Sequence, residues 1–363
     1  MESPRVRFTR RDESRFIAES KARTAAYFAD LGRSDKADAG MVLKTVVILA
    51  TAVGSYAAIM SNRFSPWEML GFAMLLGLAI AGMGFSIAHD ALHGAYSHYP
   101  IVNRVLGLSF DLVGANSYMW KITHNVIHHT YTNITGVDED LAVSPLLRLS
   151  PDADHRWFHR YQHLYGWAAY GLATLNWFFV KDYWQFLKRD LGPYHDKRHA
   201  RSAWITLVFT KLFCVVYMIV LPWLLLDLAW WQVAIGFLVM HLVAGITLGV
   251  IFQLAHIAEG VAFPLPAEDG RMAEQWAIHQ MQTTTDFAHG NRILSWFIGG
   301  LNYQVEHHLF PQVCSVHYPA IAKIVGEVAA ETGVPYHYTP TLRAAIGSHY
   351  RMLKQLGQPP AHA

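Results

Sequence analysis

The chain has 363 residues, of which 53% are hydrophobic and only 15% are charged, and it contains 12 Trp. Such a composition leaves too little polar surface for a soluble globule and indicates a membrane protein. The formal net charge of +2 argues against a nucleic-acid partner. Two cysteines, Cys214 and Cys314, provide neither a C-x2-C zinc pattern nor a disulfide framework.

The first forty residues are polar and basic, and we expect residues 1–40 to form a cytoplasmic amino-terminal arm. They contain no short apolar core with a cleavage site, so a signal peptide is not expected. The arm is either a solvated, partly helical segment or a membrane-surface helix attracted to anionic lipid.

Four apolar segments of about 20 residues follow in two pairs, and each is long enough to cross a bilayer as a helix. These predicted transmembrane helices cover residues 41–60, 67–88, 203–226 and 231–255. The short linkers within the two pairs contain a single Arg, whereas the long polar segments contain many basic residues. The positive-inside rule therefore predicts that both termini and the long segments are cytoplasmic.

The long polar segments, residues 89–200 and 256–363, are predicted to form a cytoplasmic helical cap. Two apolar stretches of the first segment, 102–120 and 164–180, are barely long enough to cross, so we expect interfacial or cap-packing helices there. The sequence thus predicts one all-α integral membrane domain over residues 1–363. Its four transmembrane helices form two hairpins, and its cytoplasmic helical cap carries a metal site.

Histidine clusters fall on one predicted side of the membrane, at the ends of two predicted spans and within both long polar segments. The most informative motif is His124-Asn-Val-Ile-His128-His129, because H-x3-HH is much rarer by chance than a single H-x3-H pair. The other members of the predicted set are His89, His93, His256, His307 and His308. Eight imidazoles exceed the four ligands that one zinc ion usually takes, so two metal ions fit better. Residue type alone does not choose among zinc, copper, iron and nickel.

Helical geometry makes the second motif more specific. His124 and His128 are expected about 5.4 Å apart, one α-helical turn, on the same face. Neighbouring residues point about 100° apart, so His128 and His129 are predicted to serve different metal ions. A ligating imidazole generally donates its second N–H to a carboxylate or carbonyl. The candidates for this supporting role are Asp90, Asn125, Asp138, Asp140 and Glu306, although a solvated loop face is an alternative for residues 138–140.

Other histidines are left out of the predicted site. Those between residues 155 and 163 lie among Arg, Trp and Tyr, which indicates an interfacial helix face, and a surface position is the simplest reading of several more. His241 lies deep in the fourth predicted span, where about 22 Å of helix separates it from His256. The histidines left out are His98, His155, His159, His163, His195, His199 and His241.

Three histidine boxes in the order H-x3-H, H-x3-HH and Q-x2-HH, spread over two membrane hairpins, closely resemble those of the membrane fatty acid desaturases. The resemblance runs from about residue 41 to residue 316. Gln304 opens the third box where many members of the family have His, a pattern typical of the front-end, linoleoyl-type and sphingolipid branches. Further matching motifs are Trp120-Lys-Ile-Thr-His124, Tyr131-Thr-Asn133, Gly136-Val-Asp138-Glu-Asp140 and Gly299-Gly-Leu-Asn-Tyr-Gln304.

The resemblance implies two iron ions, cycling between Fe2+ and Fe3+, that use O2 and two electrons to remove two hydrogens from an acyl chain. Carried over residue by residue, the family's ligands fall on His89, His93, His124, His128, His129, His256, His307 and His308. Gln304 replaces a histidine and would bind iron directly or through a water molecule. The chain lacks the His-Pro-Gly-Gly motif of a fused cytochrome domain, so a separate ferredoxin or cytochrome with its reductase is the expected electron donor. The basic arm or residues 181–201 are the expected docking sites for an acidic carrier.

The predicted function is therefore O2-dependent desaturation of a fatty acyl chain in a lipid or acyl thioester, in a protein surrounded by membrane lipids. An apolar tunnel would position the chain at the metals. Its candidate lining residues, for which core packing is the alternative role, are Tyr118, Trp120, Trp276 and Phe287.

Three alternative functions remain at this point. Hydroxylation or a related lipid oxidation at the same centre is the nearest, because ligand motifs do not distinguish the two outcomes. A metal-dependent membrane hydrolase would require a general-base Glu as in H-E-x-x-H, which is not in the sequence. A haem or metal carrier would require facing histidine pairs inside the spans, where only His241 lies.

Overall fold

The computed structural model describes residues 6–9, 14–141 and 145–359, so parts of the predicted basic arm lie outside the described residues. Four helical segments are long and apolar enough to cross a membrane. They are Ala39–Met60, Pro66–Leu92, Arg201–Leu225 and Trp230–His256. Each lies within a few residues of a predicted range. The predicted helical class with four membrane-length helices is confirmed.

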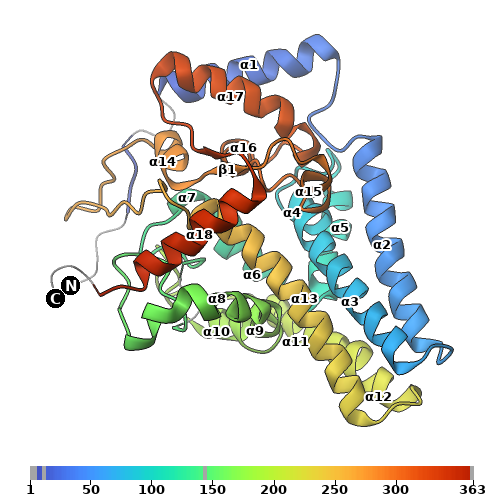
Figure 1. Cartoon of the computed structure of the whole chain (residues 1–363). Helices are drawn as coiled ribbons and strands as arrows, with labels where there is room; N and C mark the ends of the chain where they lie inside the picture. The colour runs from blue at the N-terminus through green and yellow to red at the C-terminus, as the bar shows by residue number, and fades with distance from the viewer. Residues whose placement is uncertain (1–5, 10–13, 142–144, 360–363) are drawn as a thin grey trace.

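The membrane-length segments form two hairpins at one end of the molecule, and the remaining helices form a cap at the other end (Figure 1). Two of the four segments contain a π-helical stretch, in which the backbone turn is wider than in an α-helix. The first hairpin consists of α2 (Ala39–Met60), α3 (Pro66–Gly82), η1 (Met83–Ala88) and α4 (His89–Leu92). The second consists of α11 (Arg201–Val215), η5 (Val216–Val220), α12 (Leu221–Leu225) and α13 (Trp230–His256).

Side-chain caps define where the first two long helices begin. Asp38 accepts the amide of Met41 at the start of α2 over 2.8 Å. Ser65 accepts the amide of Glu68, whose carboxylate accepts the Ser65 amide in return, and Pro66 occupies the first turn of α3. These contacts satisfy amides that have no partner within the helix. The short polar linker between α2 and α3 can therefore reverse the chain.

Small residues allow α13 to pack closely against both the first hairpin and the cap. A Cβ atom on Gly77 would lie 2.4 Å from the main-chain oxygen of Met240, and one on Gly245 would lie 2.2 Å from that of Gly171. Only glycine fits at either contact, which is the close backbone approach favoured between membrane helices. The middle of α13 thereby packs closely against α3 on one side and against α8 of the cap on the other.

The cap consists of short helices joined by loops. The amino-terminal half contributes α1 (Arg15–Leu31), α5 (Pro100–Leu112), α6 (Ser117–Trp120), η2 (Lys121–His128), α7 (His129–Tyr131), η3 (Trp157–Tyr161), α8 (Gln162–Gly171), α9 (Ala173–Asn176), η4 (Trp177–Lys181) and α10 (Asp182–Leu187). The carboxy-terminal half contributes α14 (Trp276–Thr283), β1 (Asp286–Phe287), α15 (Arg292–Phe297), α16 (Gln304–Leu309), η6 (Ser315–His317), α17 (Tyr318–Thr332), β2 (Tyr338–Thr339) and α18 (Leu342–Leu356).

The apolar stretches 102–120 and 164–180 fold as short helices of the cap, as their length predicts. Among the described residues, the departure from an all-helical fold is small. β1 and β2 form a parallel pair in which Asp286 is opposite Tyr338, and two isolated bridges occur elsewhere. The main cap core packs the start of α1 against α14, α16 and α17, and it includes Val305 and Leu309 of α16, the helix that carries the third histidine box.

Candidate metal centre

The first histidine box lies at the end of the second membrane-length segment. The π-helical η1 precedes His89, and the amide of His93 donates to the main-chain oxygen of His89 over 3.1 Å. The two imidazole centroids are 4.8 Å apart. Both rings therefore point the same way from one helical turn, as the H-x3-H spacing predicts.

The second box lies in a π-helix, where the sequence predicts an α-helix. In η2 the amide of His129 donates to the main-chain oxygen of His124, which is the i to i+5 bond of a π turn. The wider turn places His124 beside both of the later imidazoles, 5.0 Å from His128 and 4.9 Å from His129 between ring centroids. In an α-helix, His129 would point well away from His124. The change of helix type is therefore what directs all three rings into one space.

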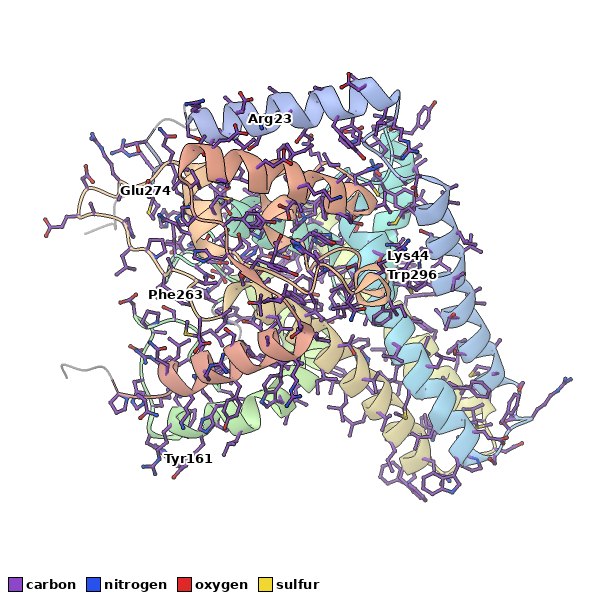
Figure 2. All side chains as sticks on the ribbon, turned by 45° about the horizontal axis from the view of Figure 1, so that its top comes forward. Arg23, Lys44, Tyr161, Phe263, Glu274 and Trp296 are labelled. Atoms are coloured by element: carbon purple, nitrogen blue, oxygen red, sulfur yellow. The ribbon has the colours of Figure 1, made fainter. Side chains whose placement is uncertain are left out.

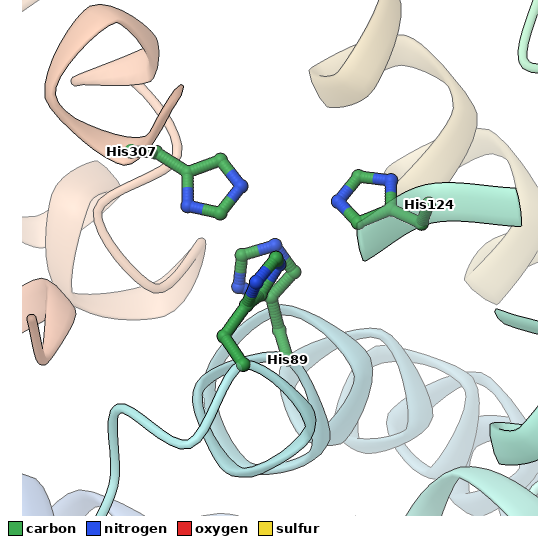
Figure 3. A group of neighbouring side chains, drawn as sticks. His89, His124 and His307 are labelled. Atoms are coloured by element: carbon green, nitrogen blue, oxygen red, sulfur yellow. The ribbon is translucent and has the colours of Figure 1, made fainter. Parts of the chain in front are cut away.

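His256, at the end of α13, and the third box on α16 complete the set. The His307 centroid lies 4.4 Å from that of His89, and the His256 centroid lies 4.7 Å from that of His128. Figure 3 shows the rings of His89, His124 and His307 directed toward one another. All eight predicted imidazoles thus meet at the junction of the spans and the cap.

The imidazoles fall into overlapping groups whose candidate ligand atoms lie within 4.8 Å of one another. One group contains His89, His93, His124 and His307, and a second contains His128, His256 and His308. A third joins His129 to His307 and His308, which connects the first two groups. His128 and His129 belong to different groups, and their rings are 84° apart. That His128 and His129 bind different metal ions stays a prediction.

The unpaired ring nitrogens fit bound metal ions. Within the described residues, six of the eight imidazoles of this set have a buried Nε2 atom without a hydrogen-bond partner. These atoms belong to His89, His93, His124, His129, His307 and His308. Among the other described histidines the same holds for His199 and His241, which do not converge with a second imidazole group. Buried polar atoms normally have a partner, and neutral imidazole nitrogens that converge in this way are suitable metal ligands.

Hydrogen bonds to the opposite ring nitrogen orient several of these imidazoles. His128 Nδ1 lies 3.0 Å from a carboxylate oxygen of Asp138, and His124 Nδ1 lies 3.2 Å from one of Asp140. An Nδ1–H donated to a carboxylate leaves the lone pair of Nε2 directed at the metal position. Asp138 and Asp140 therefore occupy the supporting positions that the sequence proposes.

The other three predicted supporting residues have different contacts. Asp90 accepts from Cys314 and Ser315, and its carboxylate lies 3.7 Å from His89 Nδ1. Asn125 donates to the main-chain oxygen of Leu92, and Glu306 accepts from Tyr336. These three side chains therefore form hydrogen bonds mainly to other residues of the cap and to the main chain of the first histidine box.

Several supporting residues are absent from the sequence prediction. His308 Nδ1 lies 2.8 Å from the amide oxygen of Gln280, and His307 Nδ1 lies 3.2 Å from the hydroxyl of Tyr318. Asn133, with a positive φ of 58°, donates to the main-chain oxygen of His256 over 3.0 Å. These residues lack any recurring spacing. Only the Tyr131-Thr-Asn133 match to the family could have drawn attention to one of them.

Gln304 lies beside the second group. Its amide nitrogen is 3.0 Å from His256 Nε2, and the side chain is fully buried. The third box therefore brings an amide to the position where many family members have an imidazole. Whether Gln304 binds a metal ion stays a prediction.

The histidines left out of the predicted site have other partners. His241 Nδ1 lies 3.1 Å from the hydroxyl of Thr174, His155 Nε2 contacts the main-chain oxygen of Gly357, and His159 Nε2 contacts that of Pro145. None of the left-out histidines belongs to a metal-binding group among the described residues.

Burial keeps most of the cap imidazoles neutral. It lowers the pKa of His124 from 6.5 to about 3, although the hydrogen bond to Asp140 acts in the opposite direction. The pKa values of His93, His129, His307 and His308 are also lowered well below 6.5, mainly by burial. The pKa of His128 is raised, because burial is outweighed by the charge of Asp138. At neutral pH most rings therefore have free lone pairs.

We expect bound metal to be lost in acid. Because these pKa values are lowered, the folded protein binds fewer protons on these rings than the unfolded chain does below about pH 6.5. The free energy of unfolding therefore has its full contribution from these rings above about pH 6.5. It falls as the pH decreases toward the folded-state pKa of His124, about 3. The metal content of purified protein, measured after desalting at stepped pH, should decrease across this window. Full retention at pH 3 would contradict an all-nitrogen site that solvent can reach.

Comparison with known proteins places these residues in a family context. A sequence model of the family described as fatty acid desaturase matches residues 65–340. The chain is 38% identical over 359 residues to the sn-1 linoleoyl-lipid 6-desaturase of a Synechocystis species, covering 98% of each chain. It is 37% identical over 344 residues to the enzyme of the same name from Arthrospira platensis, covering 94% of this chain and 92% of the relative. The acyl-lipid (8-3)-desaturase of Physcomitrium patens is 35% identical over 339 residues, which cover 93% of this chain and 70% of the relative.

Proposed function

This chain belongs to the fatty acid desaturase family, and we propose that it desaturates an acyl chain of a membrane lipid at a centre of two iron ions. It is a fatty acid desaturase and therefore an oxidoreductase, as the resemblance of its histidine boxes predicts. The observation that supports a centre of two iron ions is the convergence of eight imidazoles where the membrane-length helices meet the cap.

The proposed ligands are the eight imidazoles, with Gln304 bound directly or through water. Two iron ions held there would supply the oxidising power, with O2 as the acceptor of the hydrogens removed from the chain. The overall change converts a CH2–CH2 unit, O2, two electrons and two protons to a CH=CH unit and two water molecules. The protein's own tasks are to keep the imidazoles neutral, to orient them through Asp138 and Asp140, and to position the acyl chain.

A cavity between the two hairpins suits an acyl chain. It has a volume of about 640 Å³ and is lined almost entirely by apolar side chains of α2, α3, α13 and the η5–α12 segment. Two of its inner residues, Ile80 and Val113, also line a second, much smaller cavity that includes Phe110 and Trp177. We propose that the acyl chain extends from the metal centre through this region into the larger cavity.

Trp120 connects this region to the metal centre. Its ring stacks on His124 with 4.3 Å between centroids and contacts Phe110 at 5.4 Å. The other candidate tunnel residues have contacts of other kinds. Tyr118 bonds His199, Trp276 donates to the main-chain oxygen of His129, and Phe287 is buried in a core cluster. Of the four candidates, Trp120 is the one whose contacts support a role beside the chain.

The relatives suggest a specific substrate. Two of them are named for 6-desaturation of a linoleoyl chain at the sn-1 position of a lipid, and we propose the same class of acyl-lipid substrate here. We further propose that both termini and the metal centre are cytoplasmic, where a ferredoxin or cytochrome with its reductase delivers the electrons.

Expression in a host that lacks polyunsaturated lipids, supplied with linoleic acid and a competent electron donor, tests this function. We expect a new lipid-bound acyl chain lighter by two hydrogen atoms, with the double bond at carbon 6, and two iron ions per purified chain. His307→Ala provides the inactive control. A product heavier by one oxygen atom would favour hydroxylation instead, and an unchanged acyl profile with a full iron content would contradict desaturation.

A further inference from the structure

Trp276, the first residue of α14, connects the surface of the cap to the imidazole set. Its indole Nε1–H donates to the main-chain oxygen of His129 over 2.9 Å. The side chain is half-buried, and the preceding residues Ala273 and Glu274 are exposed. One aromatic side chain therefore extends from the accessible surface to the backbone of a proposed metal ligand.

His129 occupies the middle of the imidazole set. Its ring centroid lies 4.7 Å from that of His93, 4.9 Å from His124, 4.6 Å from His307 and 4.3 Å from His308. Among the described residues, neither of its ring nitrogens has a hydrogen-bond partner. The main-chain oxygen of His129 is thus the atom through which Trp276 contacts this histidine.

The surface around Trp276 faces away from the membrane-length helices. Figure 1 places α14 and α12 at opposite ends of the molecule, and Figure 2 shows Glu274 at the outer side of the cap. If the four long helices lie in a bilayer, this side of the cap faces water. A water-soluble protein could therefore approach α14 without contacting the membrane.

We propose that Trp276 is the side chain through which electrons enter the metal centre from a docked water-soluble one-electron carrier. This inference rests on the proposed desaturase function, which consumes two electrons per double bond. In each transfer the reduced carrier loses one electron and one ferric ion becomes ferrous, and no covalent bond forms or breaks. The indole provides a π system at the surface, and its N–H···O bond leads through His129 to the metals.

Asp140 is the alternative entry point, because it is partly exposed and contacts His124. Its carboxylate also binds Lys181, so both oxygens have partners within the protein. The neighbouring surface exposes Val180 and Trp184. The sequence predicts docking at residues 181–201, which include Trp184, but exposed apolar and aromatic side chains of this kind are typical of a membrane interface and favour a soluble carrier less. The geometry therefore favours Trp276.

The test follows reduction of the iron-loaded protein without substrate, under nitrogen, by the change in ferric absorbance. One reductant is dithionite, which needs no docking site. The other is whichever reduced carrier, a [2Fe–2S] ferredoxin or a soluble b-type cytochrome, reduces the unaltered iron-loaded protein faster. Trp276→Phe is expected to slow carrier-driven reduction about ten-fold. The dithionite rate should remain within about two-fold. Trp296→Phe, at an exposed Trp of α15, is the matched control and should change neither rate.

An unchanged carrier-driven rate in Trp276→Phe would overturn the proposal. A parallel decrease with both reductants, or a loss of iron, would also overturn it, because Trp276 would then only hold His129 in place. If the unaltered protein is reduced by both reagents but forms no double bond, the proposed function fails while the entry role of Trp276 is still measured by the reduction rates.

Docking can be tested on metal-free protein as well. A photoreactive cross-linker on Glu274→Cys should capture the oxidised carrier, whereas the same label on Lys323→Cys, at the exposed face of α17, should not. Both native cysteines are buried, so the label reports the introduced position. Equal capture at the two positions, or capture only at Lys323, would contradict docking over α14.

Discussion

His128→Ala and His129→Ala are both expected to abolish desaturation, by more than about 100-fold, but with different effects on the protein itself. His128 shares a group with His256 and His308, whereas His129 shares one with His307 and His308. Each substitution should therefore remove metal mainly from a different position. Metal analysis of the purified variants should give partial iron contents, and electron paramagnetic resonance should give distinct signals from the ions that remain.

Stability distinguishes the two variants independently of metal. His128 is bonded to the fully buried carboxylate of Asp138, so its removal leaves a buried charge without this partner and should destabilise the metal-free protein by about 3–5 kcal/mol. His129 has no ring hydrogen bond among the described residues, and its removal should lower the unfolding temperature much less. His195→Ala, at an exposed histidine, is the control for both. Two variants with identical full iron contents would refute the assignment to different ions.

Lys211→Met is expected to destabilise the protein by about 3–5 kcal/mol, because it leaves a buried carboxylate without its cation. Lys211 lies within the third membrane-length helix and donates to Asp182 and to the main-chain oxygens of Gly114 and Trp177, over 2.6, 2.6 and 2.8 Å. The two charged side chains are only 3% and 7% exposed. Gly114 and Trp177 also line the small cavity next to the proposed acyl path. Product formation should therefore fall together with stability.

Thermal unfolding in detergent, followed by size-exclusion chromatography, measures this effect. The double variant Lys211→Met with Asp182→Leu removes both charges and should recover part of the lost stability, since a buried ion pair can often be replaced by apolar residues. Lys323→Met, at an exposed position, is the control. An unchanged unfolding temperature in the single variant would show that the pair contributes little to the fold.

Composition and spacing were sufficient for the membrane class, the four long helices and the eight imidazoles. Each of these signals is local. About 20 consecutive apolar residues identify a span without any knowledge of its neighbours, and His-x3-His marks two side chains on one helical turn. Asp138 and Asp140 were also accessible to sequence reasoning, because they follow the second box closely and carry the charge that an imidazole N–H prefers.

Other parts of the site depend on contacts between segments that are far apart in the chain. The π turn at His124 to His129 was not predicted, because no residue pattern distinguishes it from an α-helix. Gln280 and Tyr318 reach His308 and His307 from helices without any recognisable spacing. The tunnel roles of Tyr118 and Phe287 stay predictions, because they rest on nearness in sequence to the boxes, which does not determine where a side chain points.

The sequence by itself therefore determined which residues carry the candidate nitrogen ligands, at the ends of two apolar helices and in the cap, in the order of a desaturase. Only the tertiary structure decided how these ligands are grouped, which side chains orient them, and where an acyl chain or an electron carrier could approach. The physical reason is that ligand type and helical period are properties of short segments. The grouping arises from the packing of α13, α16 and η2 against the end of the first hairpin, which no short segment specifies.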